Sequence, residues 1–159
     1  MPFVEDSIAD NARLLGEIDA ILLGRISYQG FSQYWPHQDD EFASLMNTPP
    51  KYVFASPGSL TAVTWGRYDN ATLIDDKVEE RVQELKSQEG RDLVILTSGG
   101  LVSSFLRLGL VDELQLVVVP VVLGAGRRYL RDVGDELADD LVDVKRYPKG
   151  SVRLTYRTA

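Results

Sequence analysis

The sequence predicts an α/β fold, in which a mostly parallel, twisted sheet is flanked by helices and continues into a C-terminal antiparallel hairpin. Short apolar stretches alternate with helical patterns as far as about residue 110. Beyond that point two stretches of alternating residues flank the turn residues Pro148-Lys149-Gly150. The 159 residues contain no linker, internal repeat or low-complexity segment, so a single domain spanning 1–159 is expected.

The first element is an amphipathic helix that begins at Ser7, which is placed to cap the first turn. Ile8, Ala12, Leu15 and Ile18 fall on one helical face and predict burial of that face. The elements that follow are bounded by glycine and proline. We expect strands at 20–24, 51–56 and 71–74, helices at 27–34 and 39–46, and a loop rich in Pro, Gly and Thr at 57–70.

The second half starts with another helix and strand pair. The stretch DLVILT at 92–97 predicts a buried strand, and residues 101–108 predict a helix that stops at Gly109. The segment 113–124 is long and extended but contains Pro120, which favours a bend or an edge position. The other expectations are an amphipathic helix from Val78 to about Gly90 and hairpin strands at 141–147 and 151–157.

Composition argues against several classes of site. The chain has no cysteine, which removes disulfides, a thiolate nucleophile and cysteine-ligated zinc. His37 is the only histidine, so no metal site and no Ser–His triad are expected, and its neighbours predict an exposed loop without a role. The net charge of −7 argues against nucleic-acid binding, which needs a basic surface.

The expected location is cytoplasmic, without a membrane partner. No apolar run approaches the roughly 18 residues of a membrane span, and the first residues lack a signal-peptide pattern. An acidic chain can still bind an anionic cofactor where backbone amides and one or two arginines make the local potential positive.

Residues 95–102 leave an apolar strand through two adjacent glycines and enter a helix at once. A helix N-terminus exposes unpaired N–H groups and about half a positive charge, so it favours a phosphate. Gly99 and Gly100 remove the side chains that would hold an anion away, and Thr97 and Ser98 offer hydroxyl donors. An ordinary strand–helix turn is the alternative, because neither common nucleotide-binding glycine spacing is present.

A second apolar strand ends in the same way, at Gly24, and is followed by Arg25 and Ser27. Arg25 can pair with a phosphate through its planar guanidinium, and Ser27 can contact the same anion. The alternative is a solvated Arg25 and a Ser27 that only caps a helix. Ligands of open α/β sheets lie outside the carboxyl ends of the strands, so both junctions are expected to face one dinucleotide.

The stretches DAILLGRISYQGFSQYWP, KYVFAS and DLVILTSGGLVSSFLRLGLVDELQLVVVPVVLGAGRRYL carry a family likeness. They resemble the dihydrofolate-reductase-like superfamily, and most of all the branch related to the reductase domain of the bifunctional riboflavin-biosynthesis deaminase–reductase. The likeness covers about residues 7 to 130. Its most specific parts are the LLGR-x-[ST]-Y junction, the SGG turn, and the run from Leu110-Val111-Asp112-Glu113 to Pro120-Val121-Val122-Leu123-Gly124.

This resemblance implies an NADP(H)-dependent reductase that transfers a hydride to a small heterocyclic (pterin or pyrimidine-like) or carbonyl substrate. It implies cofactor contacts from both junctions and from Ser56, which would lie near the adenosine ribose phosphate. The aromatic residues of the first junction would roof the substrate cleft, although an aromatic group at this spacing is also typical of a core. The implied cofactor residues are Gly24, Arg25, Ser27, Ser56, Thr97, Ser98, Gly99, Gly100 and Leu101; the implied substrate residues are Tyr28, Trp35, Pro120, Val122 and Gly124.

The chain departs from the family pattern at its start. Members usually begin with a strand that carries a Ser-Leu-Asp-Gly-like stretch and runs through the middle of the sheet, whereas this sequence opens at the following helix. A missing central strand would leave two rows of backbone groups unpaired. We therefore expect a reading frame that begins upstream, a sheet that closes differently, or strand exchange within a dimer.

The resemblance leaves the cofactor preference and the proton donor open. Relatives that prefer NADPH commonly carry a basic residue just after the serine at position 56, where this chain has Pro57-Gly58; Arg67 is a substitute if its loop folds back. Folate-reducing members place a carboxylate on the first helix, where Asp10 is a better candidate than Asp6 or Glu17, and a solvated charge is the alternative. The catalytic residue is therefore unknown.

Two other functions compete with an NADP(H)-dependent reductase. One is a non-catalytic ligand-binding or interaction domain that kept the reductase fold, and the other is a flavin-binding reductase.

A homodimer is expected, because the apolar segment 113–122 would need a cover if it lay at a sheet edge. Burial of this segment within its own sheet is the alternative.

Overall fold

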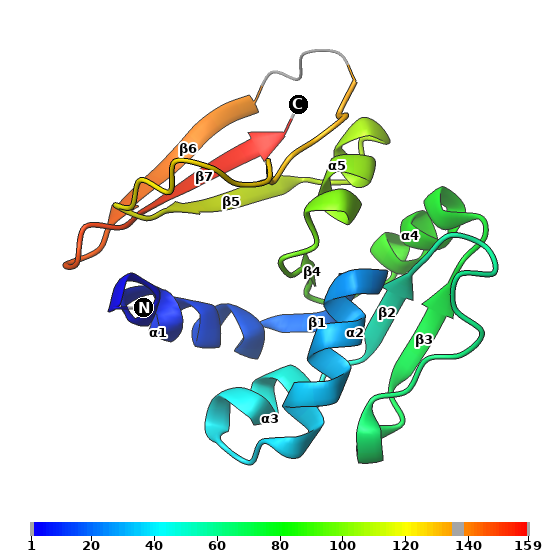
Figure 1. The fold of residues 1–159 in the computed structure, drawn as a ribbon. Coiled ribbons are helices and arrows are strands. Elements are labelled where there is room, and N and C mark those ends of the chain that lie inside the picture. Colours follow the sequence, from blue (N-terminus) through cyan, green and yellow to red (C-terminus); the bar gives the residue numbers. More distant parts are fainter. Residues whose placement is uncertain (1, 135–138, 159) are drawn as a thin grey trace.

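The computed structural model describes residues 2–134 and 139–158, and its strands form two sheets (Figure 1). A parallel sheet has the order β3-β2-β1-β4, and an antiparallel sheet has the order β5-β7-β6. The elements are α1 (Pro2–Gly16), β1 (Ile18–Gly24), α2 (Arg25–Tyr34), the 3-10 helix η1 (Trp35–His37), α3 (Glu41–Asn47), β2 (Lys51–Phe54), the 3-10 helix η2 (Gly66–Tyr68), β3 (Ala71–Ile74), α4 (Val78–Ser87), β4 (Asp92–Ile95), α5 (Gly99–Arg107), β5 (Glu113–Val118), β6 (Asp139–Arg146) and β7 (Val152–Thr158).

The predicted fold class is confirmed, because a parallel sheet flanked by helices is joined to an antiparallel hairpin. The expected single sheet is divided in two instead. The parallel sheet ends at β4, and the antiparallel sheet begins at β5. Within the described residues no strand joins them.

The parallel sheet has a core on each of its two faces. Ile21 and Leu23 of β1 pack with side chains of α1, α2 and α3, whereas Ala20 and Leu22 pack on the other face against α4 and α5. A central strand buried on both faces explains the continuous apolar run of β1. The helices of this half therefore follow from the strand pattern.

The strand β4 is less buried than the sequence predicts. It ends at Ile95, and the side chains from Leu93 to Leu96 are only half-buried. The reason is its position, because β4 pairs with β1 on one side and with no strand on the other within the described chain. An edge strand leaves part of each side chain uncovered.

The antiparallel sheet shows burial opposite to its hydrophobicity. Arg153 and Thr155 of β7 are buried, whereas Leu154 between them is half-buried. The apolar face is covered by α5 only near Leu114, so that Val144 of β6, a cross-strand neighbour of Leu154, stays 49% exposed.

Asp10 of α1 explains why the polar face of this sheet is buried. Its carboxylate Oδ2 accepts hydrogen bonds from Lys145 Nζ at 2.6 Å and Tyr147 Oη at 2.7 Å, and Arg153 Nη1 lies 3.7 Å away. These hydrogen bonds lower the pKa of Asp10, so it is a carboxylate at neutral pH. The candidate proton donor on the first helix is thus an anchor between α1 and the hairpin.

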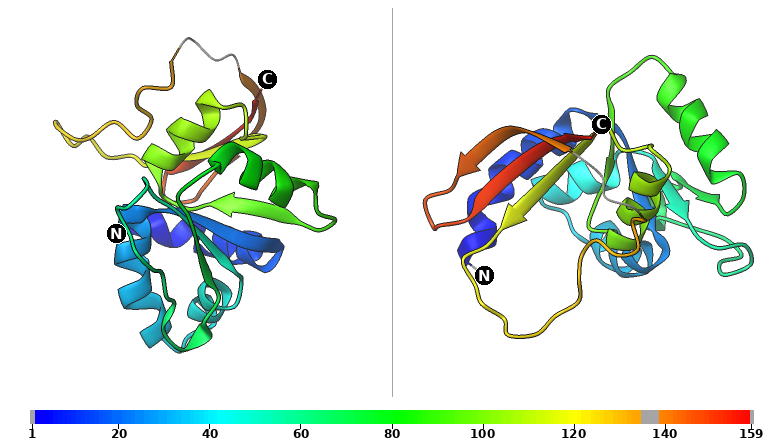
Figure 2. Two further views of the ribbon diagram at one scale, coloured as in Figure 1. Left: turned by 90° about the vertical axis from the view of Figure 1, so that its right-hand side faces the viewer. Right: turned by 90° about the horizontal axis from the view of Figure 1, so that it is seen from above.

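The start of α1 and the end of β5 differ from the sequence prediction. Ser7 is a buried residue inside α1, because the helix starts earlier, at Pro2. The strand β5 ends at Val118, two residues before Pro120, which has no N–H to offer a strand. The chain then leaves the sheet as a wide arch before it returns to the surface of α5 (Figure 2), and Val122 on this arch is 97% exposed.

No helix within the described residues is both long and apolar enough to cross a membrane.

Candidate functional site

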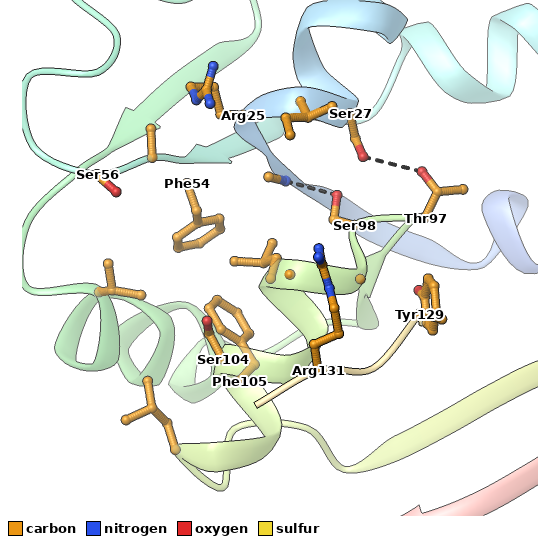
Figure 3. Close-up of a pocket in the computed structure, with 18 of the residues that line it drawn as sticks. Arg25, Ser27, Phe54, Ser56, Thr97, Ser98, Ser104, Phe105, Tyr129 and Arg131 are labelled. Atoms are coloured by element: carbon orange, nitrogen blue, oxygen red, sulfur yellow. Dashed lines mark hydrogen bonds between the residues drawn. The ribbon is translucent and has the colours of Figure 1, made fainter. Parts of the chain in front are cut away.

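The two strand–glycine–helix junctions open into one pocket. Strands β1 and β4 are parallel neighbours in register Leu22↔Ile95, so their carboxyl ends lie side by side. A pocket of about 710 Å³ is formed there, and Figure 3 shows side chains from both junctions around it. All nine residues expected to bind the cofactor line it: Gly24, Arg25, Ser27, Ser56, Thr97, Ser98, Gly99, Gly100 and Leu101.

Ser98 ties the two junctions together. The backbone N–H of Gly24 donates to Ser98 Oγ at 2.9 Å, and that hydroxyl donates to the carbonyl of Leu96 at 3.1 Å. The side chain is buried and engaged with the protein itself. Its contribution to the pocket is therefore the fixed spacing of β1 and β4, rather than a free hydroxyl.

The N-terminus of α5 is uncapped as a consequence. Ser98 makes no capping hydrogen bond, and the N–H of Gly99 turns back to Thr97 O at 3.0 Å. Within the described residues, the N–H groups of Gly100 and Leu101 have no protein partner. The first turn of this helix thus presents free donors and a partial positive charge to the pocket, which is the chemistry of an anion site.

The two glycines serve different purposes. A Cβ on Gly99 would collide with the carbonyl oxygen of Tyr129, so this glycine allows the segment 127–131 to lie against α5. A Cβ on Gly100 would meet nothing within 4 Å. Gly100 lines the pocket, so its missing side chain leaves room for a ligand next to the free N–H groups.

Three arginines that the sequence analysis did not single out also line the pocket. They come from the segment 127–131: Arg127, Arg128 and Arg131. The N–H of Arg131 donates to Ser103 Oγ at 3.0 Å, and Ser103 Oγ donates to Gly99 O at 2.7 Å, which fixes the segment on α5. Figure 3 shows the side chain of Arg131 extending toward Ser98. The sequence signal for these arginines was the basic cluster after Gly126. The cluster lies far along the chain from both junctions, so the sequence analysis did not connect it with their pocket.

Part of the pocket wall is apolar. The rings of Phe54 and Phe105 meet edge to face with centroids 5.1 Å apart, and Leu101 and Val78 extend the surface. Such a surface can hold a flat ring. Asp75, just after β3, places a carboxylate in the lining of the same pocket.

Thr97 has an unusual backbone conformation at the junction. Its φ is +54°, a region that side chains other than glycine rarely adopt, and its Oγ1 lies 3.4 Å from Ser27 Oγ. Strain of this kind persists where the surroundings hold it, as at ligand sites. It brings hydroxyls from both junctions together at the pocket wall.

The five expected substrate residues do not gather in this pocket. Tyr28 is buried in the core, where its hydroxyl accepts from Thr64 N at 2.9 Å and donates to Thr64 O at 3.2 Å. Trp35 packs against Phe42 with ring centroids 5.4 Å apart. Both follow the alternative of a core role. The other three, Pro120, Val122 and Gly124, lie on the arch after β5.

Two further residues lie away from the pocket. Arg67 pairs with Asp39 at 3.6 Å and lies over the ring of Tyr68, so its loop does not fold back toward Ser56. His37 is exposed at the end of η1, as expected.

The residues present fit a dinucleotide phosphate. Two free backbone donors, an open position at Gly100 and four arginine side chains suit phosphate groups, and the Phe54–Phe105 wall suits an aromatic ring. The strand order places this pocket at the carboxyl ends of parallel strands, where open α/β sheets bind ligands.

Comparisons with known proteins agree with the architecture. The sequence model of the RibD C-terminal domain matches residues 5–152. Over 148 residues the chain is 34% identical to the uncharacterized protein YyaP of Bacillus subtilis (strain 168). The aligned region covers 89% of this chain and 75% of YyaP.

Solved structures show the same fold. A protein of Shewanella sp. PV-4, described as a riboflavin biosynthesis protein, has a TM-score of 0.76 at 19% identity, over 96% of this chain and 79% of its own. RibD of Acinetobacter baumannii has a TM-score of 0.71 at 18% identity, over 98% of this chain and 51% of RibD. These likenesses show the fold alone.

Proposed function

This chain belongs to the RibD C-terminal domain family, and we propose that it is an NADP(H)-dependent reductase. The proposed reaction is hydride transfer to a small heterocyclic, pterin or pyrimidine-like, or carbonyl substrate. The observation that carries the proposal is the convergence of nine expected cofactor residues on one pocket beside an uncapped helix N-terminus.

The residues of the pocket bind and orient the cofactor, which supplies the hydride when bound. The N–H groups of Gly100 and Leu101 and the segment 127–131 hold the diphosphate. The apolar wall of Phe54 and Phe105 excludes water from a ring stacked on it.

Two charged residues decide between NADPH and NADH. Arg25 follows β1 directly and Asp75 follows β3 directly, and both line the pocket. A 2′-phosphate is attracted by the guanidinium and repelled by the carboxylate, whereas a ribose hydroxyl can donate to the carboxylate. We expect Asp75→Asn to favour NADPH over NADH, and Arg25→Gln to do the opposite.

The test is a titration of the protein with NADPH, followed by nicotinamide fluorescence and by calorimetry. Both tryptophans lie in the core on the far face of β1, so their quenching is a poor signal. Gly100→Ala should weaken binding by about tenfold or more, because the new methyl group enters the phosphate position. Gly30→Ala on α2 is the matched control, since its Cβ would also meet nothing within 4 Å but lies outside the pocket. Equal binding by both variants contradicts the proposed site.

A non-catalytic binding domain is the second candidate, and the missing substrate cluster favours it. Tyr28 and Trp35 are committed to the core, and Asp10 is engaged with the hairpin. Loss of reduced-nicotinamide absorbance with pterin, pyrimidine and carbonyl compounds separates the two. Binding of NADPH without turnover of any compound supports the non-catalytic domain.

We expect a homodimer as well. The arch after β5 exposes apolar side chains, with Val122 at 97% and Leu123 at 77% exposure, and such a patch is typical of an interface. A monomeric elution volume in size-exclusion chromatography, unchanged with concentration, would contradict this expectation.

A further inference from the structure

The strand β6 is an outer strand of the antiparallel sheet, and its free edge is open. Within residues 2–134 and 139–158 it pairs only with β7, and Figure 2 shows it (orange) at the outside of this sheet. All 8 of its residues are exposed. An open strand edge presents unpaired N–H and C=O groups with which another strand can pair. The hydride transfer proposed above makes no use of this edge.

The charges of β6 are sorted by sign along the strand. Its sequence from Asp139 to Arg146 reads DDLVDVKR. Two carboxylates begin the strand, two cations end it, and the apolar residues lie between them. Charges commonly protect a strand edge, because they repel a strand that approaches it. A second copy of β6 in antiparallel orientation meets opposite charges at both ends instead, because its order is reversed.

An irregularity in β6 brings the matching residues to the same face of the sheet. Val142 is an extra residue, since its neighbours Leu141 and Asp143 face two consecutive residues of β7. Leu141 and Val144 therefore lie on one face, although they are three positions apart in sequence. The same shift puts the first and last residues of β6 on that face. It puts the second and the second-last residues on the other face, toward α1.

Two copies of β6 complement each other in one register. In an antiparallel pair centred between Val142 and Asp143, directly opposed side chains lie on the same face of the sheet. Such a pair has a two-fold axis, which is the commonest symmetry of homodimers. The opposed residues, each pair formed twice, are Asp139 with Arg146, Asp140 with Lys145, Leu141 with Val144, and Val142 with Asp143.

Lys145 can take part in this pairing although it already has a partner. Its Nζ lies 2.6 Å from Asp10 Oδ2, but 48% of its side chain is exposed. A lysine ammonium has three donors, so it can bind a second carboxylate on the same face. The apolar middle of β6 gains cover as well, since Leu141 is 53% exposed and Val144 is 49% exposed.

We infer that this protein forms a two-fold homodimer in which β6 pairs antiparallel with β6 of a second copy. The two antiparallel sheets then continue as one sheet, in the order β5-β7-β6-β6-β7-β5. Recognition comes from main-chain hydrogen bonds along the edge and from the opposite charges at the two ends of each strand. This inference deepens the homodimer proposed above and gives it an interface other than the arch after β5.

The homodimer should be a weak one. The strand contributes 8 residues, fewer than the roughly 20–30 residues a side of a standard interface. We therefore expect a dissociation constant on the order of micromolar. Sedimentation equilibrium with about 1 to 200 μM protein covers the transition from monomer to dimer.

The first test reverses charges at the two ends of β6. Asp139→Arg puts an arginine opposite Arg146 at both symmetric positions, and it should weaken association by about tenfold or more. Arg146→Asp should do the same, whereas the double variant Asp139→Arg/Arg146→Asp restores opposite charges and should recover most of the affinity. Glu84→Arg on α4 makes the same change of charge outside β6 and should alter association by no more than about twofold.

A variant on the side of α1 separates edge pairing from packing of the two apolar faces. Asp140→Lys puts a cation opposite Lys145 of the second copy and should weaken association by about fivefold or more. In a dimer built by packing of the apolar faces, Asp140 lies outside the contact. Unchanged association of this variant would therefore overturn the inference.

The register is tested with single cysteines, since the chain has none of its own. Leu141→Cys mixed with Val144→Cys should give a disulfide between the two chains on oxidation, because these residues are opposed in the inferred pair. Leu141→Cys mixed with Val118→Cys is the matched control. Val118 is 54% exposed on the same face, but it belongs to β5 at the other edge of the sheet. Equal cross-linking of the control mixture would contradict the inferred register.

Two further results would overturn the inference. One is a monomer at every concentration, with the protein folded by circular dichroism. The other is a dimer that Val122→Asp on the arch dissociates while the charge variants of β6 do not. The variants of β6 lie outside the pocket and should bind NADPH like the natural protein. Absent NADPH binding beside an intact β6 dimer would contradict the proposed reductase and support this inference.

Discussion

The two sheets of this molecule differ in how well they are covered, although the strands of both contain apolar residues. In the parallel sheet, Ile21, Leu23 and Val53 are fully buried, because helices lie on both faces. In the antiparallel sheet, all of β6 is exposed, and Val118 of β5 is 54% exposed. Apolar strand residues thus lie in a sealed core in one sheet and on an open face in the other.

This difference shows that the burial of each sheet depends on the segments that connect its strands. Parallel strands need crossover connections, and most of those in this sheet contain α-helices that return over the sheet. An antiparallel hairpin needs only the turn at Pro148-Lys149-Gly150, so it brings no cover of its own. The cover of the second sheet comes from α1 and from α5.

The largest expected effect is the difference in the free energy of unfolding between apolar substitutions in the two sheets. Ile21→Ala on β1 should lower the free energy of unfolding by about 2–5 kcal/mol, because it leaves a cavity in a sealed core. Val144→Ala on β6 should stay within about 0.5 kcal/mol. Denaturant unfolding of both variants measures this, and equal losses would contradict the described difference in cover.

The next effect concerns the place where the segment 127–131 meets α5. Gly99→Ala should lower the free energy of unfolding by about 1–3 kcal/mol, since its Cβ would press on the carbonyl of Tyr129. Gly100→Ala should leave stability unchanged or raise it by up to about 1 kcal/mol, as alanine favours a helix. Thermal unfolding distinguishes them, and a stable Gly99→Ala variant would mean that the segment does not lie on α5.

A pH effect should arise in the parallel sheet, at Lys51. This side chain is fully buried, and its burial lowers the pKa of the amine to about 7. The Lys51 Nζ donates to Asn47 O at 2.5 Å and lies 4.6 Å from the centre of the Trp65 ring. The unfolded chain binds a proton near its ordinary value of 10.5, so the unfolded state holds more protons between these values. The contribution of Lys51 to stability should therefore rise from about pH 7 to pH 10.5.

The measurement is the unfolding midpoint of the natural protein and of Lys51→Met across this range. We expect the midpoint of the natural protein to gain on that of the variant as pH rises, because the variant has no buried amine to neutralise. A difference that does not change with pH would mean that the Lys51 amine keeps its ordinary pKa in the folded state.

The smallest effect belongs to the antiparallel sheet and has the same pH sign, but it falls in the acid range instead of the alkaline range. The hydrogen bonds to Asp10 lower its pKa below the unfolded value of 3.8, so its contribution is present above that value and is lost as pH falls through the folded pKa. Asp10→Asn should cost about 1 kcal/mol or less at neutral pH. Glu17→Gln, which removes an exposed pair with Arg13, is the control and should cost almost nothing. Unfolding at pH 7 and near pH 3 tests this, and a loss that persists in acid would contradict it.

The site was predictable where it depends on neighbouring parallel strands. Gly24 and Gly99 both follow apolar strands, and the carboxyl ends of adjacent parallel strands must meet at one edge. The three arginines of the segment 127–131 could not be placed in this way, because an irregular segment brings them back over α5. Tyr28 and Trp35 illustrate the same limit, since helical spacing does not distinguish a side chain in the core from one over a cleft.

The sequence by itself determined the order of strands and helices, the hairpin and the two glycine-ended junctions, because these depend on local periodicity and on the backbone freedom of glycine and proline. Only the tertiary structure decided that the strands divide into two sheets, that Asp10 holds α1 to the hairpin, and that Gly99 makes room for Tyr129 while Gly100 leaves an open place. Those outcomes depend on which distant segments come to lie against each other, and pairing between distant segments leaves no periodic signal in the chain.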